Sequence, residues 1–384
     1  MYQLKNNFST QNPPFFMPDA TYGVVNSVSW SDLKQIGTSA IVTNTLHNYL
    51  NYLNRTGRDM SLEELKNLTN SQKYNFRNLT NWQGGILTDS GGFQAYSFAK
   101  RGLGRVTDEF FKFSSPIDKS IHKLTPEKSI EIQFALYSDV IVVLDDPLEP
   151  DSEIGRIKSS VERTVRWAKI CKDYFEKRLK EINEFDNNYK PLIFCVIQGG
   201  GNFELRKYCF DKLAAIGFGG YGWGGWPLDK DGSFLDELAE FNAELVNSLN
   251  YVLNVSPMKK VYNYAMGVGA PHDIIKCLKY GYDLFDCVLP TRNARHGTIY
   301  TWNDSLCDHC SNNSSRSSFE TIRINSAKYE HDDRMINPNS KSEELRTTSF
   351  KYLRQLFKIK DSNAFRIASL QNLEFYNELV EKFC

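Results

Sequence analysis

Short apolar runs that each stop at a polar residue or a glycine recur along this chain, and they constrain its fold more than any other feature. Runs bounded in this way are typical of strands buried on both faces, as in a parallel sheet. They cover residues 39–43, 85–88, 140–144, 192–197, 264–266 and 283–285, and the residues that follow them are Asn44, Asp89, Asp145, Gln198, Gly267 and Asp286.

Helix signals lie between the apolar runs. The segment 125–127 (Thr-Pro-Glu) supplies an N-cap, a proline at the first helical position and an acidic first turn to a helix over 129–137. The segment 270–273 opens another helix, which Gly281 can stop. Helices therefore alternate with the predicted strands.

This alternation over 384 residues predicts an α/β protein. A polar residue at the C-terminal end of each strand favours a (β/α)8 TIM barrel, because the active site of that fold gathers at those ends. A doubly wound open sheet is the alternative arrangement of the same elements.

The pattern of alternation ends near residue 303, and we expect residues 1–303 to form the barrel core. Residues 304–330 are rich in Ser, Asn and Asp and are predicted to be an exposed insertion. Residues 331–384 are predicted to be a C-terminal helical appendage of the same domain, with amphipathic helices over 342–357 and 363–383.

The composition is that of an ordinary globular enzyme and excludes little. Lys+Arg and Asp+Glu each total 46, so the bulk charge gives no sign of a nucleic-acid partner, although a local basic patch is compatible with it. Most of the eight cysteines lie in apolar runs, as Cys195 does. There is no N-terminal signal and no apolar run approaching the roughly 18 residues of a membrane span. We expect a reduced, cytoplasmic protein with no membrane partner.

Three of the strand-end residues are aspartates, namely Asp89, Asp145 and Asp286, and Gln198 ends a fourth strand. A buried carboxylate is costly unless it is paired or functional. One such aspartate alone is more often a helix cap or an ion-pair partner, but three on one rim favour a catalytic site.

Glycine pairs cluster with these residues, at 91–92, 199–200, 219–220 and 224–225. They indicate either tight turns or a backbone brought close to a flat ligand. None is followed by Lys and Ser or Thr, so a phosphate-binding P-loop is not supported.

Four segments resemble the tRNA-guanine transglycosylases, the queuine/archaeosine tRNA-ribosyltransferase family. They are TDSGGFQ at 88–94, LTPEKSI at 124–130, QGG at 198–200 and FDCVLPTR at 285–292. The resemblance runs from about residue 15 to the C-terminus, apart from 304–330. It implies exchange of guanine in tRNA for a 7-deazaguanine by a pentosyltransferase.

The resemblance also implies the roles of the reacting residues. Asp286 would attack the sugar C1′ and give a covalent glycosyl-aspartate, as in retaining glycosidases. Asp89 would be the general acid/base that helps guanine to leave and then deprotonates the incoming base.

The remaining family residues would bind the substrate. Asp145, Gln198 and the backbone of Gly224 and Gly225 would hydrogen-bond the purine edge, while Phe93 would stack on its face. The base must first leave its stack, which is cheapest in a single-stranded loop.

The resemblance also implies three RNA contacts, which follow the nucleophile in the sequence. Arg292, Arg295 and His296 would hold flanking phosphates, and a solvated basic turn is the alternative interpretation.

The chain departs from the family at its structural zinc site. Ser340, Ser342, Leu345 and Gln371 stand where the family has three cysteines and a histidine. Serine and leucine do not bind zinc, so we expect that site to be lost and no cofactor to be needed. Cys307 and Cys310 could supply half of another zinc site, although two free thiols are the favoured interpretation.

The base pocket departs from the family as well. Pro147 and the segment Trp226-Pro227-Leu228 resemble the archaeal branch, whereas the nucleophile segment resembles the bacterial one. Trp226 either narrows the space around the 7-substituent or packs into the barrel wall. The sequence therefore leaves the identity of the incoming 7-deazaguanine open.

Two other functions remain as alternatives. The first is the same exchange on DNA, since no motif here reports a contact to the 2′-hydroxyl. The second is a non-catalytic tRNA-binding subunit that pairs with an active transglycosylase. Expected partners are tRNA, with DNA as the alternative, a 7-deazaguanine base and a second copy of the chain in a homodimer.

Overall fold

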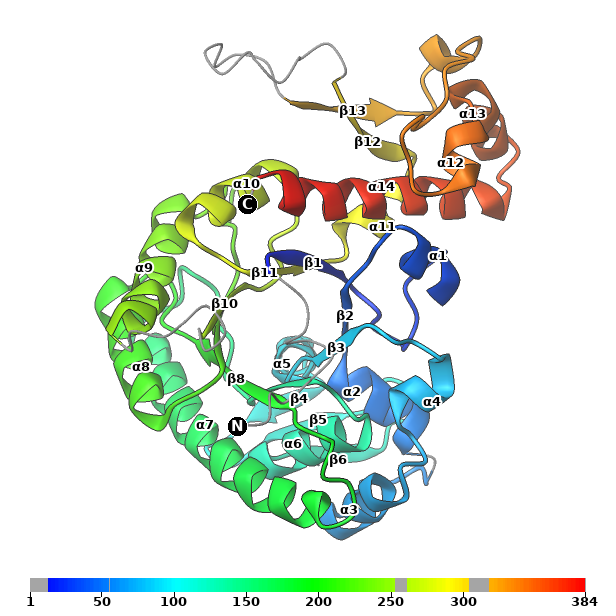
Figure 1. Ribbon diagram of the computed structural model, residues 1–384. Coiled ribbons are helices and arrows are strands. Elements are labelled where there is room, and N and C mark those ends of the chain that lie inside the picture. Colours follow the sequence, from blue (N-terminus) through cyan, green and yellow to red (C-terminus); the bar gives the residue numbers. More distant parts are fainter. Residues whose placement is uncertain (1–12, 55, 253–260, 304–317, 384) are drawn as a thin grey trace.

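Eight short parallel strands form a barrel in the computed structural model, which describes residues 13–54, 56–252, 261–303 and 318–383 (Figure 1). Their order is β1-β11-β10-β9-β8-β7-β3-β2. A parallel bridge between Asp19 and Val42 joins β1 to β2 and closes the ring. The strands are β1 Phe15–Pro18, β2 Ala40–Thr43, β3 Gly85–Thr88, β7 Val140–Val142, β8 Leu192–Ile197, β9 Gly220–Trp223, β10 Tyr262–Ala265 and β11 Leu284–Cys287.

The predicted TIM barrel is thus confirmed, and the doubly wound sheet is not what the chain forms. Each of the six apolar runs overlaps a barrel strand, and β3 and β8 have the predicted bounds. Two of the barrel strands were missed, β1 and β9. The second escaped notice because it is half glycine, and Gly220 is required there: a Cβ at this residue would lie 2.6 Å from the ring of Phe194.

Helices surround the barrel, and the longest, α7, crosses its lower left side in Figure 1. Side chains that alternate along the strands divide between two layers: Phe194 and Val196 fill the barrel interior, whereas Cys195 and Ile197 pack outward against the helices. The helices between strands are α1 Trp30–Gln35, α2 Thr45–Asn48, α3 Leu62–Ser71, α4 Phe76–Thr80, α5 Gly92–Lys100, α6 Pro126–Ala135, α7 Ile154–Asn183, α8 Phe203–Ile216, α9 Asp236–Val252, α10 Pro271–Tyr280 and α11 Leu289–Arg295, with a π-helical turn η1 at Tyr49–Leu53.

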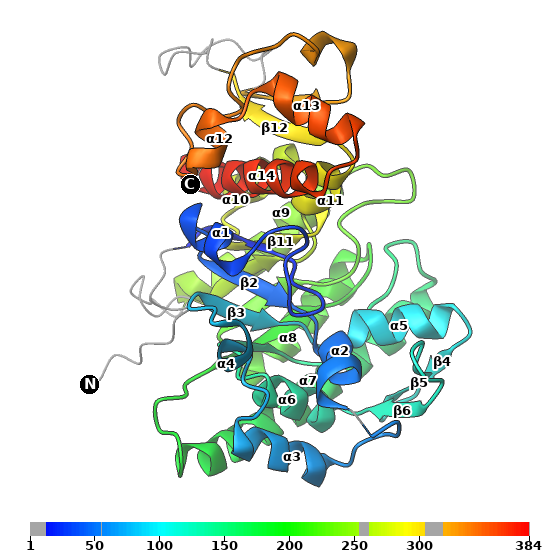
Figure 2. The ribbon, with the colours of Figure 1, turned by 90° about the vertical axis from the view of Figure 1, so that its right-hand side faces the viewer.

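A small antiparallel sheet stands beside the barrel between α5 and α6 (Figure 2). Its strands are β4 Gly104–Val106, β5 Phe111–Ser114 and β6 Ile121–Leu124. The predicted helix over 129–137 begins earlier, at Pro126, because Thr125 caps it by accepting a hydrogen bond from the Lys128 amide. No helix in the described ranges has the length and apolarity needed to cross a membrane.

The C-terminal helix α14 (Ser362–Lys382) lies between the barrel and the rest of the C-terminal part (Figure 2). Its side chains bond to distant parts of the barrel: Tyr376 donates to the carbonyl of Gly269 over 2.5 Å, and Asn377 donates to the carbonyl of Ile36 over 3.1 Å. The remaining C-terminal helices are α12 Glu343–Thr347, α13 Phe350–Lys358 and the 3-10 turn η3 Ala327–Tyr329.

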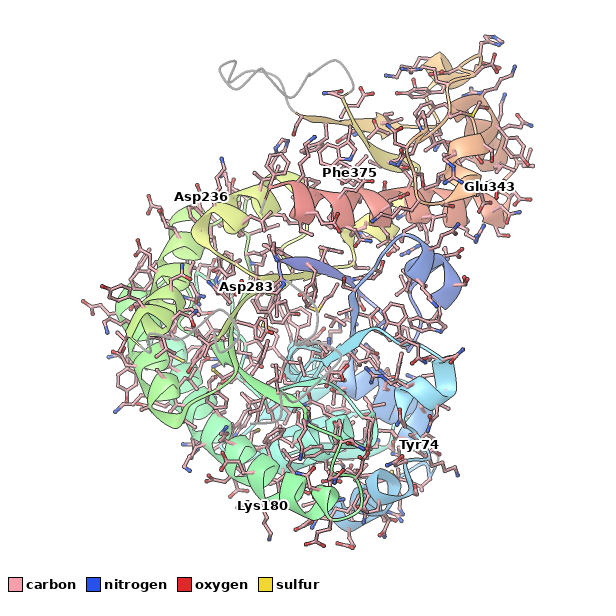
Figure 3. The ribbon with its side chains drawn as sticks, in the orientation of Figure 1. Tyr74, Lys180, Asp236, Asp283, Glu343 and Phe375 are labelled. Carbon is pink, nitrogen blue, oxygen red and sulfur yellow. The ribbon has the colours of Figure 1, made fainter. Side chains whose placement is uncertain are left out.

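A hairpin of β12 (Thr298–Trp302) and β13 (Phe319–Arg323) packs on α14. Phe375 of α14 lies beneath this hairpin (Figure 3), with its ring centroid 4.7 Å from that of Trp302. The expectation of an exposed insertion over 304–330 therefore needs correction for 319–329. Phe319, Ile322, Ile324 and Tyr329 are buried there, because the hairpin and its return cover an apolar cluster. Residues 304–317 lie outside the described part, and the boundaries at 303 and 330 stay predictions.

Candidate active site

A cavity of about 380 Å³ lies at the C-terminal ends of the barrel strands. All eight residues predicted to react with or bind the base line it: Asp89, Phe93, Asp145, Gln198, Gly224, Gly225, Trp226 and Asp286. This is the end of a TIM barrel at which catalytic residues gather.

Asp89 follows β3 and is held by two donors from the chain that follows β2 and one from its own loop. Asn44 donates from Nδ2 to Oδ2 over 2.5 Å, and the amides of Thr45 and Gly91 donate to Oδ1 over 3.0 and 3.1 Å. Burial nevertheless outweighs these donors and raises the pKa of Asp89 to about 7. A carboxyl with such a pKa can both give and take a proton near neutral pH.

Asp286 lies on β11 and receives two hydrogen bonds on the same oxygen. The hydroxyl of Tyr264 and the amide of Gly267 donate to Oδ1 over 2.7 and 2.9 Å. Within the described ranges, Oδ2 receives none, so one oxygen is anchored and the other remains available for bond formation. Burial raises the pKa of Asp286 to about 6.

Asp145 and Gln198 form a polar wall on the other side of the cavity. Gln198 donates from Nε2 to Asp145 over 2.8 Å, and Ser90 donates to the same carboxylate over 3.1 Å. Burial raises the pKa of Asp145 to about 6. The amide oxygen of Gln198 is buried without a hydrogen-bond partner among the described residues, so it is an acceptor free for a ligand.

Glycines are needed at two places to make room for this wall. A Cβ on Gly92 would lie 2.9 Å from the carbonyl oxygen of Asp145, and one on Gly224 would lie 2.6 Å from Nε2 of Gln198. The fully buried Arg206 stabilises the two glycine-containing loops after β8 and β9. It donates hydrogen bonds to the carbonyls of Gly200 and Gly224 over 2.8 and 3.2 Å. The glycines at 92 and 224 thus allow close approach within the site, whereas Gly220 of the pair at 219–220 lies in strand β9.

Trp226 contacts two other aromatic rings, of which Phe93 also lines the cavity. The ring centroid of Trp226 is 5.2 Å from that of Phe93 and 5.8 Å from that of Tyr96. Phe93 is 49% exposed and lines the cavity, so its ring is accessible to a bound base. Trp226 lines the cavity, together with Pro147 and Pro227.

Sequence reasoning missed several residues of this cavity. Asp19 and Thr21 follow β1, Ser90 follows Asp89, and Tyr264 lies within β10. The signal for Asp19 was present, since an apolar run, Phe15–Pro18, ends there. An aromatic such as Tyr264 inside a strand gives no such signal, because core tyrosines are common.

The three predicted phosphate contacts lie outside the cavity, on and just after α11. Arg292 and His296 are exposed and Arg295 is half-buried. Their role as RNA contacts stays a prediction.

The family's zinc position is filled by another set of interactions. Ser340 donates to the buried carboxylate of Glu374, which also accepts from the amide of Lys341 over 2.6 Å. Leu345 is buried in an apolar cluster, and Gln371 donates to the carbonyl of Tyr300 over 2.8 Å. The serine, leucine and glutamine side chains do not fit a zinc ion, which needs thiolate, imidazole or carboxylate ligands, and Glu374 offers only one carboxylate, which these donors already occupy.

No other metal site is found in the part of the chain that the structure describes: nowhere there do three His, Cys, Asp or Glu side chains group so as to hold an ion. Cys307 and Cys310 lie outside the described residues.

The barrel and the carboxylates gathered on one cavity define a TIM-barrel enzyme equipped for acid–base chemistry. A sequence model of the family described as Queuine tRNA-ribosyltransferase matches residues 3–383. The chain belongs to this family.

Curated relatives that carry the same name support this family membership. The protein from Nitratidesulfovibrio vulgaris (strain DP4) is 35% identical over 367 residues, which is 96% of this chain and 84% of the relative. The protein from Halothermothrix orenii is 34% identical over 380 residues, or 99% of this chain and 88% of the relative. The protein from Blochmanniella floridana is 35% identical over 373 residues.

Proposed function

We propose that this chain exchanges guanine in tRNA for a 7-deazaguanine through a covalent bond between the sugar and Asp286. The observation that carries the proposal is the unequal state of two carboxyls on one cavity. Asp286 has one anchored oxygen and a pKa of about 6, whereas Asp89 has a pKa of about 7. One oxygen of Asp286 is free to form a bond, as a nucleophile requires, and burial raises the pKa of Asp89 toward neutrality, so this carboxyl can give and take a proton as a general acid/base must.

The reaction then proceeds in two displacements. Asp286 forms a bond to C1′ while the C1′–N9 bond breaks, and Asp89 gives its proton to the departing guanine. In the second displacement, Asp89 removes a proton from the incoming base. The nitrogen of that base bonds to C1′, and the electron pair of the ester bond returns to Asp286. The enzyme ends in its starting protonation state.

The wall of Asp145 and Gln198 explains how one cavity can hold two bases in turn. Guanine and 7-deazaguanines share the ring edge that carries an amino group and a ring N–H, and they differ at position 7. The Asp145 carboxylate and the free amide oxygen of Gln198 are acceptors suited to that shared edge. Stacking on the exposed ring of Phe93 would add affinity that does not depend on position 7.

The target base reaches the cavity only if it leaves its stack, which favours a single-stranded loop of tRNA over duplex DNA. Arg292 and His296 are exposed on the segment that follows the nucleophile, where flanking phosphates would pass. A non-catalytic subunit is disfavoured, because the reacting carboxyls retain their supporting hydrogen bonds.

The test is incubation of the purified protein with radiolabelled guanine and either bulk tRNA or duplex DNA. Label should enter tRNA and not DNA, and Asp286→Asn should incorporate none. Label in DNA alone would establish the DNA alternative. Label in neither polymer, from a folded protein, would favour the non-catalytic subunit.

A further inference from the structure

A fourth carboxylate, that of Asp19, lines the same cavity and has no part in the two displacements. Asp19 directly follows β1, and its Oδ1 accepts a hydrogen bond of 2.5 Å from the hydroxyl of Thr21, which lines the cavity as well. Burial raises the pKa of Asp19. A half-buried carboxylate beside two reacting carboxyls is costly, so its presence calls for a function.

The barrel order fixes where Asp19 stands relative to the reaction. In β1, Met17 pairs with Asp286 of β11, and Asp19 itself bridges to Val42 of β2, two residues before Asn44. Asp19 therefore lies on the arc of the barrel between the nucleophile and the residues that hold Asp89. Strand β8, which ends at Gln198, is the one farthest from β1 around the ring.

These positions divide the cavity into a base side and a sugar side. In the proposed reaction, C1′ must meet Asp286 while its base faces Asp145 and Gln198 across the barrel. The rest of the sugar is then directed away from the base, toward the arc of β11, β1 and β2. The carbon that bears the 2′-hydroxyl is bonded to C1′, so this hydroxyl belongs to the same arc.

We infer that Asp19 accepts a hydrogen bond from the 2′-hydroxyl of the target nucleotide and makes the site selective for ribose over 2′-deoxyribose. This inference rests on the proposed function and adds the sugar contact to it. An O–H donor to a carboxylate forms a strong hydrogen bond. In glycosyl transfer, such contacts to the 2-hydroxyl strengthen as positive charge develops at the reacting carbon.

The same contact penalises DNA. A 2′-deoxy nucleotide would leave Asp19 with one donor fewer in a confined site, and sites built around a substrate hydroxyl reject analogues that lack it. The 2′-hydroxyl is also the group by which proteins tell RNA from DNA at a given position.

The test uses the full chain and two synthetic tRNA hairpins that differ at one atom. One carries the guanosine that the enzyme labels, and the other carries 2′-deoxyguanosine at that position. Incorporation of radiolabelled guanine gives kcat/KM for each hairpin. The ratio of the two combines the intrinsic reactivity of C1′ with the contact to the 2′-hydroxyl. It should fall about 10- to 100-fold from the wild type to Asp19→Ala.

Comparing this ratio between the wild type and Asp19→Ala cancels the effects that do not involve a direct contact between Asp19 and the 2′-hydroxyl. Loss of the 2′-hydroxyl alters the intrinsic reactivity of C1′, and loss of Asp19 alters the charge felt by Asp89 and Asp286. The first effect is the same in both proteins, and the second is the same for both hairpins. Only a direct interaction between Asp19 and the 2′-hydroxyl therefore changes the ratio. Asp211→Asn is the control, because Asp211 is exposed on α8 and outside the cavity, and it should keep the wild-type ratio.

An unchanged ratio in Asp19→Ala would overturn the sugar contact while the exchange activity stands. Thermal unfolding checks that the variant folds. If Asp19→Ala does not fold, Asp19→Asn takes its place in the test. An amide oxygen is a weaker acceptor than a carboxylate, so the ratio must drop several-fold in that variant. A wild type that labels neither hairpin would overturn the proposed function, and this inference with it.

Discussion

The hydroxyl of Tyr264 donates a hydrogen bond of 2.7 Å to Oδ1 of Asp286 from the neighbouring strand of the barrel. Tyr264 is almost fully buried, and burial raises its own pKa well above 10, so it remains a donor at any working pH. The bond stabilises the ionised form of Asp286, which is the form that attacks C1′.

Replacing this tyrosine by phenylalanine should therefore move the acidic side of the pH profile. Tyr264→Phe removes a donor to the carboxylate, so the pKa of Asp286 rises and less of it is ionised below neutrality. A hydrogen bond to a charged group is worth about 1.5–3 kcal/mol, or roughly one to two pH units. Measured as kcat/KM for guanine exchange, the rate should fall about 10-fold at pH 6 and much less at pH 8. An equal loss at both values would contradict this role.

The wild type should show a narrow bell-shaped dependence of kcat/KM on pH. The acidic limb near pH 6 follows from the ionisation of Asp286 and Asp145, and the basic limb near pH 7 from loss of the proton on Asp89. These carboxyls lie on one cavity and influence each other's titration. Each limb therefore reports an apparent pKa of the interacting carboxyls and not the pKa of one residue. Asp89→Asn should lose about 10²–10⁴-fold in rate and lose the basic limb. A basic limb that persists would assign it to another group.

Asp286→Asn should remain folded, trap no covalent RNA adduct and gain stability at high pH. Its amide oxygen can keep the bonds from Tyr264 and Gly267. The folded-state pKa of Asp286 is raised from its ordinary 3.8 to about 6, so the wild type loses stability as pH rises through this interval. The substitution removes that loss. The unfolding free energy of the variant should match that of the wild type near pH 4 and exceed it at pH 8 by on the order of 1–3 kcal/mol.

The adduct itself is measured by denaturing electrophoresis after incubation with tRNA and a competing 7-deazaguanine. The wild type should give a band of protein joined to RNA. A band that survives in Asp286→Asn would transfer the nucleophile's role to Asp89 or Asp145.

Trp226 should set the size of the 7-substituent that the cavity accepts. Its ring lines the cavity beside Phe93, and Pro147 and Pro227 stiffen the walls and lack backbone donors. Small 7-deazaguanine precursors should therefore outcompete queuine in kcat/KM. Trp226→Val should shift this ratio toward queuine by about 10–200-fold. A wild type that uses queuine equally well, or an unchanged ratio in the variant, would make Trp226 a packing residue.

The C-terminal part should be stable without zinc. Elemental analysis of protein purified without added metal should give well under one zinc per chain, and a chelator should leave the unfolding midpoint in urea unchanged. Ser340→Ala removes a donor to the buried Glu374 and should cost about 1–3 kcal/mol. Stoichiometric zinc that disappears on mutating Cys307 and Cys310 would contradict the expectation of no metal.

The sequence predicted the barrel because most of its strands are buried on both faces and end in a polar residue. That pattern located Asp89, Asp145, Gln198 and Asp286, which share one cavity. It failed for β9, where Gly220 makes room for a neighbouring ring and supplies no apolar side chain. The strand β13 was missed because its burial depends on α14, far away in the sequence.

The helix α14 has a consequence for synthesis on the ribosome. The residues predicted to act on the substrate all precede position 300, yet Tyr376 and Asn377 tie the chain near Gly269 to the chain near Ile36, on either side of the seam where the first and last strands meet. A nascent chain can thus carry every reacting group and still lack the brace that holds this seam together. A premature stop codon near residue 360 should abolish activity although the entire cavity has already been translated.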